Sequence, residues 1–336
     1  MTDATLHIVL TGATGFLGGH LVPKLLKNGH HVTCIVRQSS DTTHLPKDVR
    51  ILRCDLTNEC DIYEALKGQD IFIHLAALLF GLEWNDYLEA NTMAAQSITR
   101  AIKALGTNGP KRVVLISSMA ATGPSKGTIG VDDHDNPQPV SAYGWSKLLV
   151  ERTFLCQCKN IVILRPSIIY GSGDKGLLPL FKGIKHGFAV SPGLSPFPVS
   201  CVHATDMADA IMAVMDKETC GIYHVSDGKC YTMEEFCRSA AKAMGINHFC
   251  ILHLPLPLLA LSAKLSTLFF SLLHRLPWLK FKRMPNWNYD KYREAAQAGW
   301  VCNIKRLHTE MGYQPRISLE AGLEETIAGY QARGWL

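Results

Sequence analysis

Short apolar runs alternate with stretches of helical periodicity over the first half of the chain. The apolar runs predict β-strands at 6–10, 31–36, 50–54, 70–75, 111–117 and 161–165, and apolar positions three and four residues apart predict helices at 16–28, 60–67, 86–105 and 142–157. Strands that alternate with helices in this way form a doubly wound parallel sheet, an α/β fold. A ligand of such a sheet is expected beyond the carboxyl ends of the strands.

The alternation of strand-like and helical segments stops after residue 166. Residues 171–200 are rich in Gly, Pro and Ser, which indicates loops over a site. The strand-like runs 199–202 and 222–225, with a helix at 205–216 between them, are expected to return to the main sheet. We therefore predict a first domain over residues 1–171, joined by 199–225, and a smaller C-terminal lobe built from 172–198 and 226–336.

One strongly apolar stretch, residues 254–273, stands out from the rest of the chain. Pro255, Pro257 and Lys264 interrupt it, and its clean helical part is shorter than the roughly 20 residues that span a bilayer. We expect a buried helix of the second lobe. The alternative is an apolar lid or a membrane-contact element over 254–283, because a basic cluster follows at His274, Arg275, Lys280, Lys282 and Arg283.

Composition narrows the class of protein. The 336 residues are 47% hydrophobic and 19% charged, and the net charge of +5 comes from scattered basic residues, which argues against nucleic-acid binding. Eleven cysteines without regular spacing favour a reduced, cytoplasmic compartment. No signal peptide is expected, because the first strand begins by Leu6. Cys156 and Cys158 lack a second pair of ligands, so no metal site is expected.

A glycine-rich turn follows the first strand. Gly12, Gly15 and Gly18 are spaced three apart in the segment TGATGFLG at 11–18, between a strand and a helix. Glycines there permit a tight turn, the approach of a pyrophosphate to the main chain, and close packing of helix on strand. The helix N-terminus favours an anion, so this turn predicts a dinucleotide site.

A tyrosine and a lysine share one face of a predicted helix. Tyr143 and Lys147 are four residues apart, and an ammonium near a phenol favours the phenolate, which makes the tyrosine a usable acid–base group. Ser117 and Ser118 end the strand at 111–117, at the edge where ligands bind. Ser118 is placed to hydrogen-bond a substrate oxygen, whereas Ser117 is also explained as a turn residue.

Together these segments resemble the extended short-chain dehydrogenases/reductases, the superfamily of sugar-nucleotide epimerases, dihydroflavonol reductases and 3β-hydroxysteroid dehydrogenases. The resemblance covers most of the chain. It rests on TGATGFLG at 11–18, Asp55-Leu56, His74-Leu75-Ala76-Ala77, Asn91, Ser117-Ser118, YGWSK at 143–147, RPSIIYG at 165–171, VHATD at 202–206 and a tail over 307–323.

The resemblance implies a Rossmann fold and a role for each matched residue. Tyr143 would be the general acid–base, Lys147 would bind the nicotinamide ribose and tune Tyr143, and Ser118 would orient the substrate oxygen. His74 is expected to be a packed structural residue. The implied cofactor contacts are Gly12, Thr14, Gly15, Phe16, Leu17, Gly18, Arg37, Asp55, Leu56, Leu75, Ala76, Ala77, Tyr143, Lys147, Pro166 and Ser167. The family also favours a homodimer formed through the helices at 86–105 and 142–157.

The residue after the second strand bears on the choice of cofactor. An NAD-selective site normally carries an acidic residue there, but this chain has Arg37 followed by Ser39 and Ser40. A guanidinium suits a 2′-phosphate, so we predict NADP preference. The alternative is that Arg37 stacks on adenine and that both NADP and NAD are used.

The substrate is expected to be a small molecule of apolar character. Nucleotide-sugar enzymes of the superfamily generally carry an arginine before the VHATD segment, and residues 193–200 hold no cation. Leu78-Leu79-Phe80, the Pro196-Phe197-Pro198 loop and the 254–273 stretch suit an apolar ligand. We expect oxidoreduction of a sterol, terpenoid or flavonoid. The alternatives are a nucleotide-sugar epimerase or dehydratase, with Lys182, Lys185 or His186 supplying the cation, and a non-catalytic cofactor-sensing regulator.

Overall fold

A seven-stranded sheet forms the centre of the computed structural model, which describes residues 5–81, 83–274 and 285–336. Its strand order is β11-β6-β5-β4-β1-β2-β3, and every neighbouring pair is parallel. The strands are β1 His7–Thr11, β2 His31–Val36, β3 Arg50–Arg53, β4 Ile71–His74, β5 Arg112–Ile116, β6 Ile161–Pro166 and β11 Gly221–Val225. The predicted doubly wound α/β fold is confirmed. The strand order reverses between β1 and β4, which opens a crevice at their carboxyl ends.

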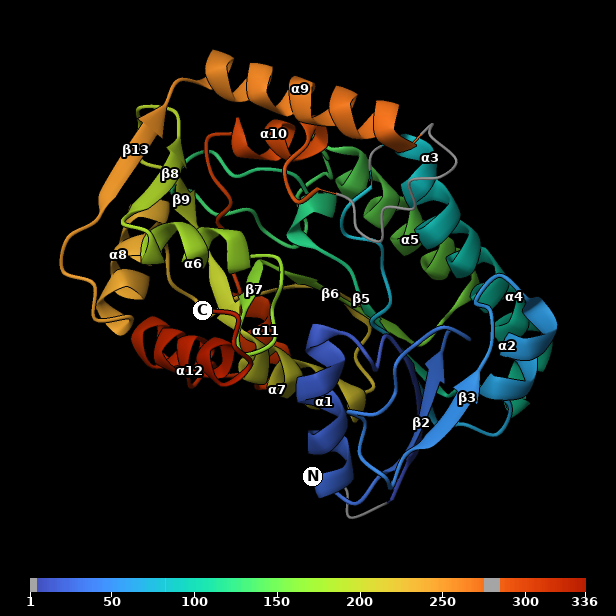
Figure 1. The fold of residues 1–336 in the computed structure, drawn as a ribbon. Coiled ribbons are helices and arrows are strands. Elements are labelled where there is room, and N and C mark those ends of the chain that lie inside the picture. The colour runs from blue at the N-terminus through green and yellow to red at the C-terminus, as the bar shows by residue number, and fades with distance from the viewer. Residues whose placement is uncertain (1–4, 82, 275–284) are drawn as a thin grey trace.

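Helices cover both faces of this sheet (Figure 1). The first face carries α1 (Phe16–Lys27) and α7 (Ala204–Met215), and the second carries α2 (Glu59–Leu66), α4 (Ala94–Leu105) and α5 (Ala142–Gln157). In β1, Ile8 and Leu10 pack in the cluster on the first face, and Val9 packs in the cluster on the second. Burial on both faces explains why the strands read as continuous apolar runs.

The predicted helix at 86–105 is present, but it is not a regular α-helix throughout. It comprises α3 (Trp84–Tyr87), a π-helical segment (Leu88–Met93) and α4. Asn91 lies in the π-helical segment and is buried, where its side chain accepts a hydrogen bond from Leu78 N at 2.7 Å. π-helical turns inside α-helices often lie at functional sites, and this one fixes the loop after β4.

One part of the predicted sheet is wrong. Residues 221–225 do join the main sheet as β11 beside β6, but β10 (Cys201–His203) pairs with β7 (Ile168–Tyr170) in a separate two-stranded sheet. β7 continues the line of β6 past Ser167, whose N–H donates to Val225 O. Since β11 already occupies the place beside β6, β10 can pair only with the continuation.

A second group of elements packs around its own aromatic core. It contains α6 (Leu178–Lys185), β8 (Phe188–Pro192), α8 (Met233–Ala243), β13 (Cys250–Leu254) and α12 (Leu319–Ala332), with Phe181, Phe236 and Tyr330 buried between them. Two short strands, β9 (Pro198–Val199) and β12 (Tyr231–Thr232), pair antiparallel, and α11 (Lys305–Met311) packs on β11. The boundary between the two lobes stays a prediction.

The apolar stretch forms α9 (Leu256–His274), which lies across the top of the molecule in Figure 1 above α10 (Tyr289–Ala295). The expected buried helix is wrong: only 11% of the window Leu256–Leu273 is buried. The helix is also longer than expected, because Pro255 and Pro257 lie at its start, where proline is tolerated. Among the described residues it is the one helix whose length and composition would allow it to cross a membrane, which is weak evidence taken alone. Residues 275–283 of the predicted contact element lie outside the described residues.

Candidate active site

The glycine-rich turn lies at the reversal point of the sheet, between β1 and α1. Gly12 has φ +76°, and a Cβ there would come within 2.8 Å of Ala76 N in the loop after β4. A Cβ on Gly18 would lie 2.5 Å from the carbonyl oxygens of Gly12 and Ala13. Gly12 therefore makes the turn possible, and Gly18 allows α1 to pack closely on it.

The N-terminus of α1 is ready for an anion. Gly15 is the N-cap residue, no side chain caps the helix, and its first turn holds no acidic residue. The first N–H groups of the helix, from Phe16 and Leu17 onward, thus lack a capping side chain, and Thr14 lies in the turn before them. These features fit the pyrophosphate of a dinucleotide, and the contact itself stays a prediction.

A buried histidine fixes the loop after β4. Thr11 Oγ1 accepts a hydrogen bond from Ala76 N at 3.2 Å and also hydrogen-bonds His74 Nδ1, at 2.8 Å. Burial lowers the pKa of His74 to about 3, and the nearby Lys147 lowers it further, so the ring is neutral. His74 thus holds Leu75, Ala76 and Ala77 against the glycine turn, which agrees with a structural role.

Two arginines lie near the end of β2: Arg53 hydrogen-bonds the loop that follows it, whereas the Arg37 side chain does not. Arg53 Nη1 donates to the carbonyl oxygens of Arg37, Gln38 and Ser40, at 3.2, 2.8 and 3.2 Å. Sequence reasoning missed this clamp, because Arg53 ends the neighbouring strand. The Arg37 side chain is exposed and has no hydrogen-bond or ion-pair partner among the described residues.

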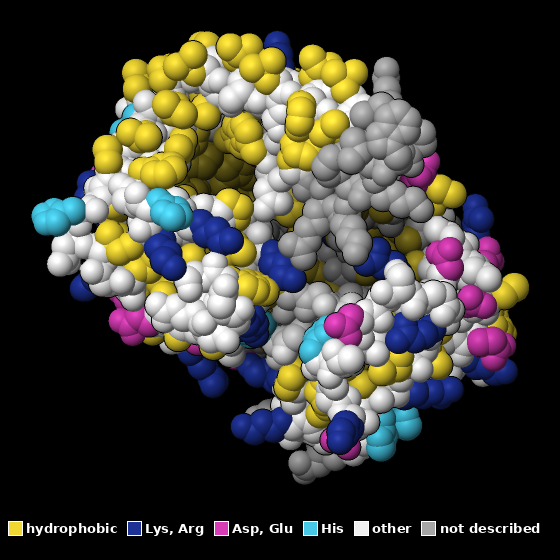
Figure 2. Space-filling model, in the orientation of Figure 1, with side chains coloured by type: hydrophobic (Ala, Val, Ile, Leu, Met, Phe, Trp, Pro, Cys, Tyr) yellow, Lys and Arg dark blue, Asp and Glu magenta, His cyan; other side chains and the backbone are white. Residues whose placement is uncertain are grey.

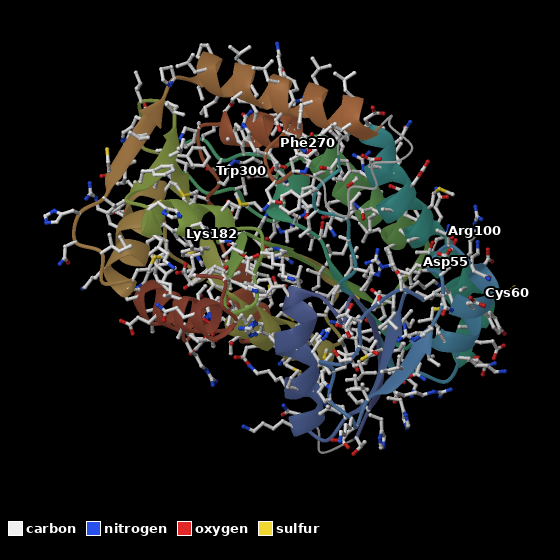
Figure 3. All side chains as sticks on the ribbon, in the orientation of Figure 1. Asp55, Cys60, Arg100, Lys182, Phe270 and Trp300 are labelled. Carbon is white, nitrogen blue, oxygen red and sulfur yellow. The ribbon has the colours of Figure 1, made fainter. Side chains whose placement is uncertain are left out.

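Asp55 and Leu56 come just after β3, and Asp55 is labelled in Figure 3. The Asp55 carboxylate accepts hydrogen bonds from the N–H and the hydroxyl of Thr57, each at 2.9 Å, and these bonds lower its pKa. Leu56 is half-buried. Asp55 therefore shapes the turn that leads into α2, and its predicted contact with adenine stays a prediction.

The structure brings the predicted serine and tyrosine together. The Ser118 hydroxyl lies beside the Tyr143 phenol and lowers its pKa, against the larger effect of burial, which raises it. Tyr143 lies in the first turn of α5, where the N-cap residue Ser141 accepts from Gly144 N at 2.9 Å. A Cβ on Gly144 would lie 2.4 Å from Ala120 O, so glycine lets α5 approach the loop after β5.

Lys147 lies one helical turn further into α5 and is buried. Its Nζ donates to Ile116 O at 2.7 Å. Burial lowers its pKa to about 8, while the Glu151 carboxylate acts in the opposite direction. Glu151 is itself buried and accepts from Arg165 Nε at 2.9 Å, from Arg165 Nη2 at 2.6 Å and from the Ser117 hydroxyl. Ser117 is therefore a structural residue, whereas Ser118 faces the tyrosine.

A buried hydroxyl without a partner lies where the nicotinamide is expected. Ser167 Oγ is buried and has no hydrogen-bond partner among the described residues. It follows Pro166 at the end of β6, at the carboxyl edge of the sheet. An orphaned polar atom at this place fits a contact with the bound cofactor.

Sequence reasoning missed α10, which holds the start of the catalytic helix. Asp290 accepts from Ala142 N at 2.6 Å and from Tyr143 N at 3.3 Å, and Glu294 accepts from the Ser141 hydroxyl at 2.6 Å. Lys291 Nζ lies 4.5 Å from the centroid of the Tyr143 ring and 2.9 Å from Glu294 Oε2. No local motif marks these residues, because about 150 residues separate them from α5.

Apolar side chains surround the tyrosine. Tyr87, Ala120 and Tyr143 form one buried cluster, against which Leu78 and Trp300 pack. Phe80 lies nearby, with Lys291 Nζ 5.6 Å from its ring centroid. Figure 2 shows a hollow lined by hydrophobic side chains beneath α9, and Figure 3 places Trp300 in this region, with Lys182 of α6 below it.

The VHATD segment is structural. His203 caps α7, since its Nδ1 accepts from Thr205 N at 3.3 Å. The buried Asp206 accepts from the main-chain N–H groups of Arg316 and Ile317, at 3.1 and 2.9 Å. Phe197 of the predicted apolar loop is buried. The bonds of Asp206 thus join α7 to the segment before α12.

The chain can now be compared with known proteins. Residues 8–226 match the model of the NAD dependent epimerase/dehydratase family. The chain is 29% identical over 342 residues to the ceramide reductase of Caulobacter vibrioides, with 100% of this chain and 98% of that protein covered. It is 30% identical over 257 residues to the UDP-glucose 4-epimerase of Vibrio cholerae, with 70% and 75% covered.

Among solved structures, MoeE5 in complex with UDP-glucose and NAD has a TM-score of 0.75 at 22% identity, with 97% of this chain and 99% of that chain covered. This likeness concerns the fold. The family match spans more than half of the chain and includes the glycine turn, Tyr143 and Lys147. The chain belongs to the NAD-dependent epimerase/dehydratase family and is an NAD(P)-dependent oxidoreductase of the extended short-chain dehydrogenase/reductase type.

Proposed function

We propose that this protein interconverts a secondary alcohol and a ketone on an apolar molecule. The observation that carries the proposal is the Ser118 hydroxyl beside the Tyr143 phenol, inside an apolar cluster with Leu78 and Trp300. The hydroxyl pair is a polar feature in this largely apolar wall, so it can select an oxygen on an otherwise apolar ligand.

The proton chemistry belongs to Tyr143. A bound nicotinamide supplies or accepts the hydride at the carbon that carries the oxygen. In reduction Tyr143 Oη gives its proton to that oxygen, and in oxidation the phenolate takes it back. Ser118 hydrogen-bonds the same oxygen and orients it. The Lys147 ammonium favours the phenolate, and its bond to Ile116 O fixes its position.

The relatives support an apolar substrate, with one competitor. The relative that covers the whole chain is named a ceramide reductase, which extends our expectation from sterols, terpenoids and flavonoids to long-chain lipids. The other relative is a UDP-glucose 4-epimerase. Residues 193–200 bring no cation to pair with a diphosphate, but Lys182 of α6 lies below Trp300 in Figure 3. Nucleotide-sugar epimerisation therefore remains the second candidate.

A ligand panel distinguishes the two candidates. We expect long-chain ketones or hydroxysteroids, together with the cofactor, to raise the melting temperature and to turn over, whereas UDP-glucose does neither. Stabilisation by a UDP-sugar alone, lost in Lys182→Ala but kept in Lys185→Ala on the same helix, would establish the epimerase instead. Cofactor binding without turnover of any substrate would favour a regulator.

We further propose NADP as the preferred cofactor, because the exposed Arg37 guanidinium is free while Arg53 holds the loop. Arg37→Ala should weaken NADP binding by about tenfold or more and leave NAD binding nearly unchanged, the usual worth of a charge-assisted contact. Arg50→Ala is the matched control, because Arg50 begins β3 whereas Arg53, which holds the loop, ends it. Tighter binding of NAD than of NADP, unaltered in Arg37→Ala, would refute this preference.

A further inference from the structure

The outer face of α9 is apolar and uncovered. Leu258, Leu261, Leu265, Leu268 and Leu272 recur at spacings of three and four residues, so they form one stripe along the helix. Each is between 54% and 58% exposed. An ordinary helix on the surface of a globular protein turns such a stripe toward the core, and α9 turns it away.

Three hydroxyl side chains of α9 bond to the protein on its other side. Ser266 donates to Trp287 O at 2.7 Å, Ser262 accepts from Trp287 Nε1 at 3.1 Å, and Thr267 Oγ1 accepts from Tyr289 N at 2.9 Å. The helix is thus held to the segment around α10 by hydroxyl groups, and its orientation is fixed by these bonds.

The neighbouring strands β8 and β13 also turn apolar side chains outward. In β8, Ala189 and Ser191 are buried, whereas Phe188 is 44% and Val190 38% exposed. Leu252 of β13, the register partner of Val190, is 43% exposed. Figure 2 shows the hydrophobic side chains as one surface over α9, β13 and β8, beside the apolar hollow.

We propose that this surface, the outer stripe of α9 with the outer faces of β8 and β13, docks on the surface of a lipid bilayer. No Asp or Glu occurs in α9, β8 or β13, so these elements bring no acidic side chain to the surface. Lys264, at the edge of the stripe, lies 5.5 Å from the Tyr289 ring and can reach head groups. The helix lies in the interface and does not span the bilayer, because its other face is bonded to the protein.

Docking there places the active site next to the lipid. α9 packs on α10, whose Asp290 and Lys291 contact Tyr143, and the apolar hollow opens beside the docking surface. A lipid substrate would then enter the hollow from the bilayer without crossing water. This last step rests on the proposed function, whereas the docking itself rests on α9, β8 and β13.

Flotation with phosphatidylcholine vesicles tests the docking. The wild-type protein should float with the vesicles at low and at high salt, because burial of apolar surface drives the contact. The triple variant L261S/L265S/L268S should lose at least about tenfold in the floated fraction. A control with the exposed apolar residues Met93, Ile129 and Leu155 changed to Ser should float like the wild type.

The read-out is binding, so it does not depend on catalysis. All variants should keep the wild-type melting temperature and NADP affinity. Failure of the wild-type protein to float, or equal flotation of the two triple variants, would overturn the docking and leave the proposed reaction untouched. A wild-type dimer that becomes monomeric in the α9 variant, without vesicle binding, would identify a second copy as the occupant instead.

Discussion

At the scale of single residues, Tyr143 is the group on which the chemistry depends. Tyr143→Phe removes the hydroxyl beside Ser118 and keeps the ring in its apolar cluster. Turnover should fall by a factor on the order of 10² to 10⁴, the usual worth of a positioned acid–base group, with cofactor affinity nearly intact. Steady-state kinetics and cofactor titration check this.

Tyr87→Phe is the matched control for that change. The Tyr87 ring lies 6.1 Å from the Tyr143 ring, and its hydroxyl donates to Gly81 O at 3.4 Å. Its loss should change turnover by only a few-fold. Wild-type turnover in Tyr143→Phe would contradict the assignment of the acid–base group.

The pH dependence of reduction follows from Lys147. Burial lowers its pKa to about 8 from the usual 10.5, so in the folded protein the ammonium is present below about pH 8 and is lost above it. The rate of reduction should therefore fall on the alkaline side near pH 8. Lys147 contributes least to the free energy of unfolding at neutral pH, where its charge must stay buried. This contribution rises as the pH rises from 8 to 10.5, because the unfolded chain then binds more protons than the folded one.

Glu151→Gln should move this alkaline limb to lower pH, because the carboxylate raises the pKa of Lys147. It should also lower stability, on the order of 3 kcal/mol, since Arg165 then lacks its buried counter-charge. Ser117→Ala keeps the carboxylate and should leave the limb in place. A pH–rate profile at a temperature where all three proteins are folded gives the answer, and an unshifted limb in Glu151→Gln would contradict the coupling.

At the scale of elements, two adjacent glycines in α1 separate close packing from helix formation. A Cβ on Gly18 would lie 2.5 Å from two carbonyl oxygens, whereas a Cβ on Gly19 meets nothing within 4 Å. Gly18→Ala should destabilise the protein and weaken cofactor binding. Gly19→Ala should be neutral or raise stability by up to about 1 kcal/mol through helix propensity. Equal effects of the two changes on melting temperature and cofactor affinity would contradict this account of the turn.

The elements that local sequence determines were predictable. The strands of the main sheet, the glycine turn and the Tyr143–Lys147 spacing depend on residues close in sequence, and their positions agree with the prediction. The placement of β10 depends on competition with β11 for the β6 edge, which no local pattern carries. The role of Asp290 at α5, and of Arg165 beside Glu151, likewise depends on contacts between distant segments. The apolar pattern of 254–273 predicted a helix but not which of its faces is covered.

At the scale of the whole molecule, α10 connects the apolar surface to Tyr143. α9 packs on α10, whose Lys291 lies over the Tyr143 ring, and Trp300 packs against the same buried cluster. This arrangement favours a ligand that enters from the apolar side and meets the nicotinamide at Tyr143. Pairing of two copies through α4 and α5 stays a prediction, which light scattering of the purified protein would test.

The balance of cofactor and product decides between reduction of an apolar ketone and epimerisation of a nucleotide sugar. The protein is incubated with reduced, deuterium-labelled NADP and a long-chain or steroid ketone, and oxidised cofactor and product are counted by mass spectrometry. We predict one oxidised cofactor for each alcohol formed, with deuterium on the carbon that carries the new hydroxyl, and loss of both in Tyr143→Phe. Conversion of a UDP-sugar with no net change in the cofactor, and no reaction of any apolar ketone, would contradict the account.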